Sequence, residues 1–257
     1  MVWWCAWHLG DTMSNQEQSL LTTLTLHGWP ERIASDIALG AHVVEYRKRS
    51  TIFRAGEPAD LVYFLLSGAV RVLYGVAPGS RILVGIAYPS ELLGRITLAV
   101  ESSENDPRQV FTAETHSSAK IAIVSLTRLS QTLHQLPPAD LIQVLGRLGD
   151  DWAKLSCRLL ALLSMSIRER LTYCIEEIAG RFGTAEAQGT LIGLRLSHED
   201  LADLVGASRP IVSKHLKKLT HEGVLSRHGG RYLLRNDGAA GLSWPQAEPA
   251  PAQPTPI

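Results

Sequence analysis

Apolar and polar residues follow three different patterns along this chain. Residues 19–40 contain two short stretches with helical spacing. Residues 42–125 contain short, β-branched apolar runs, separated by turn signals such as Gly56-Glu57-Pro58 and Ser67-Gly68. Runs of this length and spacing are typical of a β-sandwich or barrel. From Pro138 the spacing becomes helical. The pattern therefore predicts an α+β protein in which a β-roll of the jelly-roll type, residues 19–136 with flanking helices, precedes a helical region.

The first helix after the roll carries a narrow apolar stripe. Its apolar residues step alternately by four and by three, the spacing of a two-stranded coiled coil, over about three heptads. A helix packed on its own core would show a broader apolar face. We therefore expect residues 137–164 to form a coiled-coil dimerisation helix and the protein to form a homodimer; packing within one chain is the alternative. The interface residues are Leu141, Leu145, Leu148, Trp152, Leu155, Leu159 and Leu162.

Capping signals divide the rest of the chain into short elements. Ser166 and Glu169 form a capping box, which predicts a helix over Ile167–Phe182 after a break at residues 164–166. Thr190–Leu196 resembles a strand, and Ser197 with Asp200 predicts a second capped helix that ends at Gly206. A third helix is expected to begin after Ser208, with Arg209 and Pro210 in its first turn, and to end before Gly223. A first-turn proline is compatible with a helix because the first four N–H groups have no partner within the helix.

A hairpin around His228-Gly229-Gly230 completes the region. Two helices joined by a glycine turn and followed by a hairpin predict a winged helix-turn-helix over residues 166–237. Residues 197–236 contain seven Lys/Arg and four Asp/Glu, a net charge of 7 − 4 = +3, whereas the whole chain has a net charge of zero. The sequence therefore predicts that this unit binds double-stranded DNA.

In the second helix of such a unit, the side chains near the N-terminus meet base edges in the major groove. Ile211, Val212, Leu216 and Leu219 are expected to face inward. Arg209 can bond guanine through two hydrogen bonds, and Lys217 suits a phosphate. The residues expected to contact DNA are Ser197, Ser208, Arg209, Pro210, Ser213, Lys214, Lys217, Lys218, Arg227 and Arg231.

Composition narrows the class of protein. The 257 residues are 45% hydrophobic, and no apolar run approaches the roughly 18 residues that a membrane helix needs, so we expect no membrane partner. Cys5, Cys157 and Cys174 share no CxxC spacing; free thiols in a reducing cytoplasm are expected, and no iron–sulfur cluster.

The two ends of the chain differ from the rest. Residues 1–18 form an extension of uncertain meaning, a poor match to a signal peptide, and Met13 is an alternative start. Residues 238–257 contain five prolines and are expected to be a disordered tail.

These features, in this order, resemble the CRP/FNR family of bacterial transcription regulators. The resemblance covers residues 42–236 and rests on the roll, the long helix, the break and "LSHEDLADLVGASRPIVSKHLKKLTHEGVLSRHGGRYLL". In "AGEPADLVYFLLSGAVRV", Gly56, Ala59, Tyr63 and Gly68 stand at the family's spacing. The resemblance implies a sensor roll in each subunit of a homodimer, whose effector reorients the winged helices onto a palindromic operator, and it makes RNA polymerase a plausible partner.

The first departure from the family pattern points to a different input. In cyclic-AMP-binding members, a Gly-Glu-Leu motif supplies the glutamate that accepts from the ribose hydroxyl. Here Gly94 is followed by Arg95, so the charge is inverted. Arg108 lies near the place of the phosphate-binding arginine, and Gln109 replaces the next serine. In the long helix, Leu155-Ser156 stands where adenine-contacting hydroxyl residues are found, and only Ser156 keeps a hydroxyl. We therefore expect an effector other than cyclic AMP.

A small anion could bind between Arg95 and Arg108 instead. The candidate effector residues are Gly94, Arg95, Ile96, Thr97, Arg108, Gln109, Leu155 and Ser156. A roll without any ligand is an equal alternative. Binding of 2-oxoglutarate does not carry over, because Asp151 stands where related regulators are expected to have an arginine. Haem binding through His42 or His116 is a further alternative.

The second departure concerns the output. Pro210 stands where cyclic-AMP-type members read a base with glutamate, which proline cannot do. We therefore expect an operator that keeps a guanine contact from Arg209 and otherwise differs from the cyclic-AMP-type half-site.

The alternatives to a transcription regulator are an enzyme and a regulatory module for a protein partner. An enzyme is not expected, because a cupin-type metal site needs a His-x-His cluster with a carboxylate and a further histidine, which the roll lacks. The remaining alternative is a cyclic-nucleotide-type regulatory module that acts through a protein partner and not through DNA.

Overall fold

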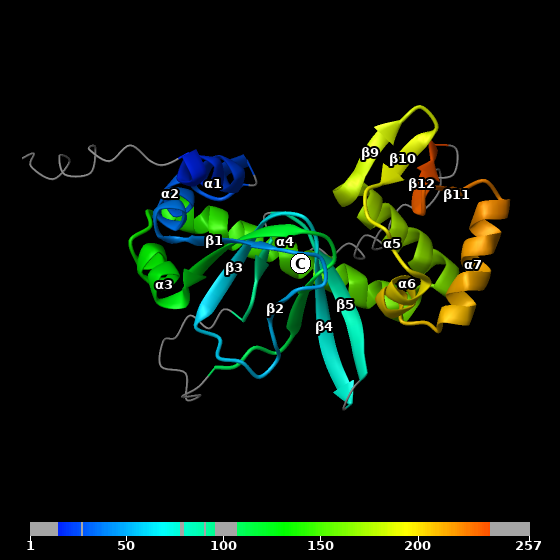
Figure 1. Ribbon diagram of the computed structural model, residues 1–257, viewed down its shortest axis with the longest axis horizontal. Coiled ribbons are helices and arrows are strands. Elements are labelled where there is room, and N and C mark those ends of the chain that lie inside the picture. The colour runs from blue at the N-terminus through cyan, green and yellow to red at the C-terminus, as the bar shows by residue number, and fades with distance from the viewer. Residues whose placement is uncertain (1–14, 27, 78–79, 90, 96–106, 237–257) are drawn as a thin grey trace, which may run out of the picture. The chain divides into compact units, whose positions relative to one another are not determined.

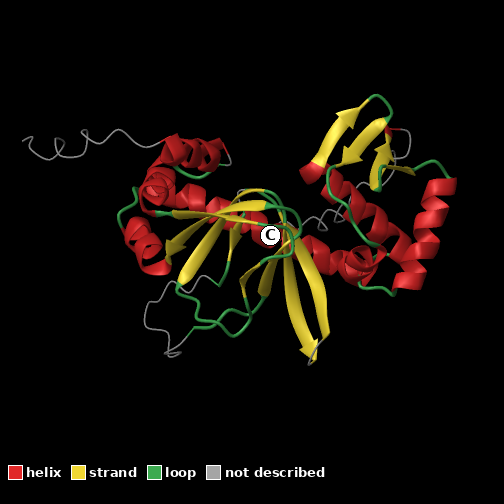
Figure 2. Ribbon diagram, in the orientation of Figure 1, coloured by secondary structure: helices red, strands yellow, loops and turns green. Residues whose placement is uncertain are grey.

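The computed structural model describes residues 15–26, 28–77, 80–89, 91–95 and 107–236, and these form two compact units that divide between Leu159 and Leu160 (Figure 1). The predicted α+β class is confirmed, with an N-terminal unit built on strands and a C-terminal unit rich in helices (Figure 2). Of the extension expected over residues 1–18, residues 15–18 belong to the first helix, which begins at Asn15, and residues 1–14 lie outside the described residues, as does the tail expected over residues 238–257.

The first unit combines two antiparallel sheets with four helices among its described residues. Its sheets have the strand orders β1-β8-β3-β6 and β2-β7-β4-β5. The strands are β1 His42–Tyr46, β2 Thr51–Phe53, β3 Leu61–Ser67, β4 Val70–Ala77, β5 Ser80–Ala87, β6 Leu92–Leu93, β7 Thr112–Thr115 and β8 Ala119–Ser125. The helices are α1 Asn15–Leu26, α2 Glu31–Gly40, α3 Leu126–His134 and α4 Pro138–Ser164, the last of which continues into the second unit.

Strand β3 is apolar along most of its length because both of its faces are covered. Alternate side chains of a strand point to opposite faces of the sheet. Tyr63 and Leu65 belong to the core between the two sheets, whereas Val62 and Phe64 belong to a second core on the other face. The same alternation occurs in β8, so these two strands hold the unit together.

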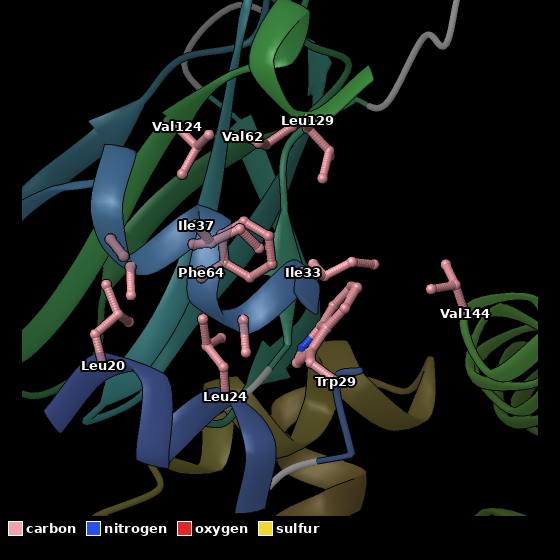
Figure 3. Close-up of a cluster of buried hydrophobic side chains, with 13 residues drawn as sticks. Leu20, Leu24, Trp29, Ile33, Ile37, Val62, Phe64, Val124, Leu129 and Val144 are labelled. Atoms are coloured by element: carbon pink, nitrogen blue, oxygen red, sulfur yellow. The ribbon is translucent and has the colours of Figure 1, made fainter. Parts of the chain in front are cut away.

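The second core lies between the outer face of this sheet and the helices (Figure 3). Trp29, in the turn before α2, packs edge-on against Phe64 with ring centroids 5.3 Å apart. Val144 of α4 belongs to the same cluster, and the guanidinium group of Arg147 lies 4.7 Å from the Trp29 ring. The N-terminal half of α4 is thereby fixed to the roll.

The second unit contains helices α5 Ile167–Phe182, α6 His198–Val205 and α7 Arg209–His221, with one sheet in the order β11-β12-β10-β9 among its described residues. The strands are β9 Gly183–Glu186, β10 Gly189–Ile192, β11 Leu225–His228 and β12 Arg231–Arg235. The capping box predicted for α5 is present, with Ser166 and Glu169 bonded reciprocally. The break between α4 and α5 also falls where the sequence predicts it.

Four elements differ from the sequence prediction. The strand expected over Thr190–Leu196 ends at Ile192, where Gly193 N–H donates to the Phe182 carbonyl and the chain leaves the sheet. Strands β6 and β9 and helix α3 are absent from the prediction. The signal for α3 was available, since Leu126, Leu129 and Leu133 recur at helical spacing and pack in the second core described above.

Candidate DNA interface and effector region

Helix α6, the first helix of the predicted helix-turn-helix, has a capping interaction at each end. In α6, the Ser197 hydroxyl accepts from Asp200 N–H at 3.0 Å and donates to the Asp200 carboxylate at 2.7 Å. The helix ends at Gly206, whose φ of 63° is left-handed, a conformation that glycine adopts without steric cost. The side chain of Arg170 in α5 donates to the Val205 carbonyl at 2.9 Å, so this carbonyl at the C-terminal end of α6 has a hydrogen-bond partner. The Ser197 hydroxyl, a predicted DNA contact, is thus already engaged in capping.

Helix α7 begins as predicted. Ser208 occupies the N-cap position with extended backbone angles, although its side chain makes no capping bond. Arg209 and Pro210 follow as the first and second helical residues. Gly223, with a φ of 76°, follows the C-cap residue Glu222. The proline is therefore part of a regular helix start.

Helix α7 buries one face and exposes another. Val212, Leu216 and Leu219 recur at four- and three-residue spacing and are buried, as predicted. The inward placement predicted for Ile211 is wrong: its side chain is 41% exposed. One residue before Val212, it is turned about 100° around the helix axis, away from the buried stripe. Ser208, Arg209, Pro210, Lys214, Lys217 and Lys218 are also exposed.

The wing is the hairpin of β11 and β12. His228 pairs with Arg231, and the two glycines between them have φ angles of 57° and 80°, as the tight turn of such a hairpin requires. Arg231 is exposed at this turn. Arg227 is exposed as well, but its guanidinium group donates to the Tyr232 hydroxyl at 2.7 Å and lies 4.8 Å from that ring.

A histidine that sequence reasoning missed connects these elements. His198, the first residue of α6, has Nδ1 2.7 Å from the Ser213 hydroxyl and Nε2 3.1 Å from Arg227 Nη2. Burial lowers the pKa of His198, and the nearby charges of Arg227, Arg209 and Lys217 lower it further. The available signal was its position directly after the N-cap residue, at the end of the helix that faces α7.

In the roll, the four described candidate effector residues outside α4 lie close together. Gly94, with a φ of 105°, precedes Arg95, whose backbone N–H donates to Gln109 Oε1 at 2.9 Å. The side chain of Arg108 donates to the Gly56 carbonyl at 3.0 Å, and that of Arg95 reaches the Arg108 carbonyl at 3.5 Å. Both guanidinium groups are thus directed at backbone carbonyls. Ile96 and Thr97 lie outside the described residues.

Gln109 is the buried member of this group, at 3% exposure. Its side-chain Nε2 atom is enclosed and has no hydrogen-bond partner among the described residues. Leu155 and Ser156, the remaining candidates, lie on α4, where Leu155 is exposed and Ser156 half-buried. Within the described part of the chain, no group of three or more His, Cys, Asp or Glu side chains could hold a metal ion.

The seam predicted for α4 is largely open to solvent in the single chain. Its seven residues are 39% to 73% exposed, and Trp152 is the most exposed. The face of the helix beside this seam contacts the roll, where Arg158 lies beside Gly85 and Val144 is buried. The helix therefore uses one face within the chain and presents the adjacent, apolar seam outward. As for membrane insertion, none of the helices described has the length and apolarity to span a bilayer.

Comparisons with known proteins agree with this geometry. Residues 43–135 match the family model of the cyclic nucleotide-binding domain, and residues 153–239 match that of the Crp-like helix-turn-helix domain. The chain is 28% identical over 240 residues to the CRP-like protein Clp of Xanthomonas oryzae pv. oryzae, covering 86% of this chain and 98% of that protein. It is 29% identical over 202 residues to Clp of Xanthomonas campestris pv. campestris, covering 76% and 84%.

Solved structures share the fold. The c-di-GMP responsive global regulator CLP of Xanthomonas campestris superposes with a TM-score of 0.63 and 24% identity, covering 79% of this chain and 98% of that one. FixK2 from Bradyrhizobium japonicum superposes with a TM-score of 0.64 and 23% identity, covering 77% and 93%.

Proposed function

The chain belongs to the CRP/FNR family of bacterial DNA-binding transcription regulators, and we propose that it binds a palindromic operator as a homodimer. The exposed, positively charged first half of α7, framed by the wing, is the observation that carries this proposal. In a dimer the two α7 helices would enter successive major grooves about 34–36 Å apart. The protein would act by binding DNA and not by catalysis. We propose the cytoplasm as its location and RNA polymerase as a further partner.

Arg209 is the proposed base reader. It stands in the first turn of α7, it is exposed, and a guanidinium group matches the two acceptors on the major-groove edge of guanine. Pro210 brings no donor to the base edge. Ile211 adds an apolar surface in the same turn that suits the methyl group of thymine.

The other predicted contacts would hold the DNA backbone. Ser208, Lys214, Lys217, Lys218 and Arg231 are exposed and suited to phosphates. The hydroxyls of Ser197 and Ser213 already form hydrogen bonds within the protein, with Asp200 and His198. These two residues would therefore support DNA binding by holding α6 and α7 in position.

The exposed seam of α4 is the proposed dimer interface, with residues 19–136 as the effector-type domain and 166–237 as the DNA-binding domain. Leu141, Leu145, Leu148, Trp152, Leu155, Leu159 and Leu162 would lose their solvent contact against the same residues of a second copy. Burial of this many apolar side chains is the main favourable term in such association. The break at residues 164–166 would then be the hinge between sensor and DNA-binding domain.

The roll is proposed to bind a small anionic effector other than cyclic AMP, near Arg95, Arg108 and Gln109. The Nε2 atom of Gln109 supports a site here, because a buried donor without a partner is costly unless a ligand or water completes it. One regulator with this fold responds to c-di-GMP, which makes that dinucleotide the first compound to test. Binding should raise the midpoint of thermal unfolding in wild type and less in Arg95→Ala or Arg108→Ala.

A gel shift with genomic fragments at several salt concentrations tests the regulator function. Specific binding whose affinity falls steeply with salt is expected, since neutralised phosphates release counterions. Selection of bound sequences then defines the operator. Recovery of the unmodified cyclic-AMP-type half-site would contradict the role given to Pro210 and Arg209, and absence of binding with any effector would contradict the function itself.

A further inference from the structure

His198 lies where three elements of the DNA-binding unit meet. It opens α6, its Nδ1 atom is 2.7 Å from the Ser213 hydroxyl of α7, and its Nε2 atom is 3.1 Å from Arg227 Nη2 of β11. The same Arg227 nitrogen donates to the Tyr232 hydroxyl of β12. The imidazole ring therefore connects α7, the recognition helix, with the wing, and both elements are expected to contact DNA.

The chemistry of Arg227 decides the protonation state of this ring. A guanidinium group can only donate, so Nε2 must accept and cannot carry a proton. In the neutral ring the proton then lies on Nδ1, which donates to the Ser213 hydroxyl. A second proton, on Nε2, would break the bond to Arg227 and bring two positive charges together.

The surroundings of His198 oppose that second proton. Arg209 and Lys217 of α7 and Arg227 of β11 place positive charge around the ring, and partial burial removes water from it. The Tyr232 hydroxyl of β12 is engaged by Arg227. On its own helix, Glu199 is exposed, and the Asp200 carboxylate accepts from Ser197. DNA would supply the missing negative charge, because its phosphates would face the same cations.

We propose that His198 is a positioning residue of the DNA interface: its neutral ring orients Ser213 and Arg227, and it takes up a proton when Arg227 turns to a phosphate of bound DNA. This inference rests on the proposed operator binding. Because the protonated ring faces phosphates only in the complex, the pKa of His198 is higher in the complex than in the free protein. Affinity is therefore independent of pH above the higher of these two pKa values and rises as the pH falls below it.

Operator affinity, measured by fluorescence anisotropy at constant salt, tests the proposal. Each unit by which DNA raises the pKa of one His198 ring corresponds to about a tenfold gain in affinity at acid pH. Wild type should thus bind about tenfold more tightly or more at about pH 6 than at about pH 8. His198→Gln keeps an acceptor for Arg227 but does not titrate, so it should bind like wild type at the higher pH and lose most of the gain.

His42→Gln is the matched control, because His42 is exposed in β1 of the roll, outside the DNA-binding unit. It should keep the wild-type pH dependence. A pH dependence that is unchanged in His198→Gln, absent in wild type, or removed by His42→Gln overturns the proposal while leaving operator binding intact. Failure of wild type to bind DNA at either pH overturns operator binding and this inference together.

Nuclear magnetic resonance of the histidine side-chain nitrogens gives a measurement that needs no variant to fold. In free wild-type protein near pH 7, His198 should show the neutral ring with the proton on Nδ1. Addition of operator DNA should shift its titration to higher pH. An unchanged titration in saturated complex would overturn the proposal.

Discussion

Arg168, in the first turn of α5, donates to both carboxylate oxygens of Glu222, at the C-cap of α7. One of these distances is 3.0 Å. The pair joins the helix that follows the break at residues 164–166 to the far end of the recognition helix. The bond from Arg168 holds the pKa of the Glu222 carboxyl below its usual value, against an opposing effect of burial. A fork-shaped pair of this kind fixes orientation as well as distance.

The first prediction concerns the pH dependence of this pair. A carboxyl whose pKa is lower in the folded state stabilises the fold above its unfolded pKa, and the contribution disappears as the pH falls through the folded value. Glu222→Gln should therefore lower stability toward urea near pH 7, and the difference from wild type should vanish in more acid solution. The effect is small because the pair is on the surface. A difference that persists at acid pH would show that Glu222 acts through packing instead.

The second prediction concerns the exposed seam of α4. Replacing Leu148 and Leu155 together with Asp puts two charges into the proposed apolar interface, where burial of an unpaired charge is very costly. Sedimentation should show monomers, and the affinity for a full palindrome should fall with the loss of the second half-site. Gln143→Asp, which adds a charge on α4 outside the seam, should leave both properties unchanged. Monomers that bind the palindrome as tightly as wild type would contradict the coupling.

Much of this architecture is predictable because it depends on local chemistry. Capping boxes at Ser166 and Ser197, and the glycine that ends α6, define helix limits through interactions within a few residues. The apolar spacing of α4 predicts its length and its open face. These signals persist whatever the rest of the chain does, which explains why the amino-acid sequence alone predicts the winged helix-turn-helix.

The features that the sequence did not predict have two different causes. Ile211 resembles a core residue by type, but its local position in the helix, one residue before Val212, turns it outward. The hydrogen bonds from the side chains of Arg95 and Arg108 to the carbonyls of Arg108 and Gly56 join residues 13 and 52 positions apart. The bridge through His198 joins residues 15 and 29 positions apart, and no local pattern announces it.

The third prediction separates base reading from phosphate binding. Arg209→Ala should lower affinity for the operator by about 1–3 kcal/mol and remove the preference for guanine at one position of each half-site. Arg231→Ala, at the wing turn, should weaken binding to all sequences alike. It should also reduce the slope of log affinity against log salt concentration by about one per protomer. Anisotropy with every single-base variant of the operator distinguishes these outcomes. An equal loss on all sequences for Arg209→Ala would assign that residue to the phosphates.

The fourth prediction concerns Ile211, whose exposed side chain follows Arg209 and Pro210 in the first turn of α7. An apolar side chain there can cover the methyl group that distinguishes thymine in the major groove. Operators in which single thymines are replaced by uracil lack only that methyl. At the position read by Ile211, wild type should lose about 0.8 kcal/mol, roughly fourfold in affinity.

Ile211→Ala separates this contact from other effects of removing the methyl group. The variant should bind the thymine and uracil operators equally, because it has lost the surface that covers the methyl. Ile211→Val retains part of that surface and should show an intermediate difference. The alanine change leaves the buried face of α7 intact, since Val212, Leu216 and Leu219 form it, and the thermal stability should stay near that of wild type. A uracil penalty of equal size in wild type and Ile211→Ala would mean that another side chain, or the shape of the DNA, reads the thymine.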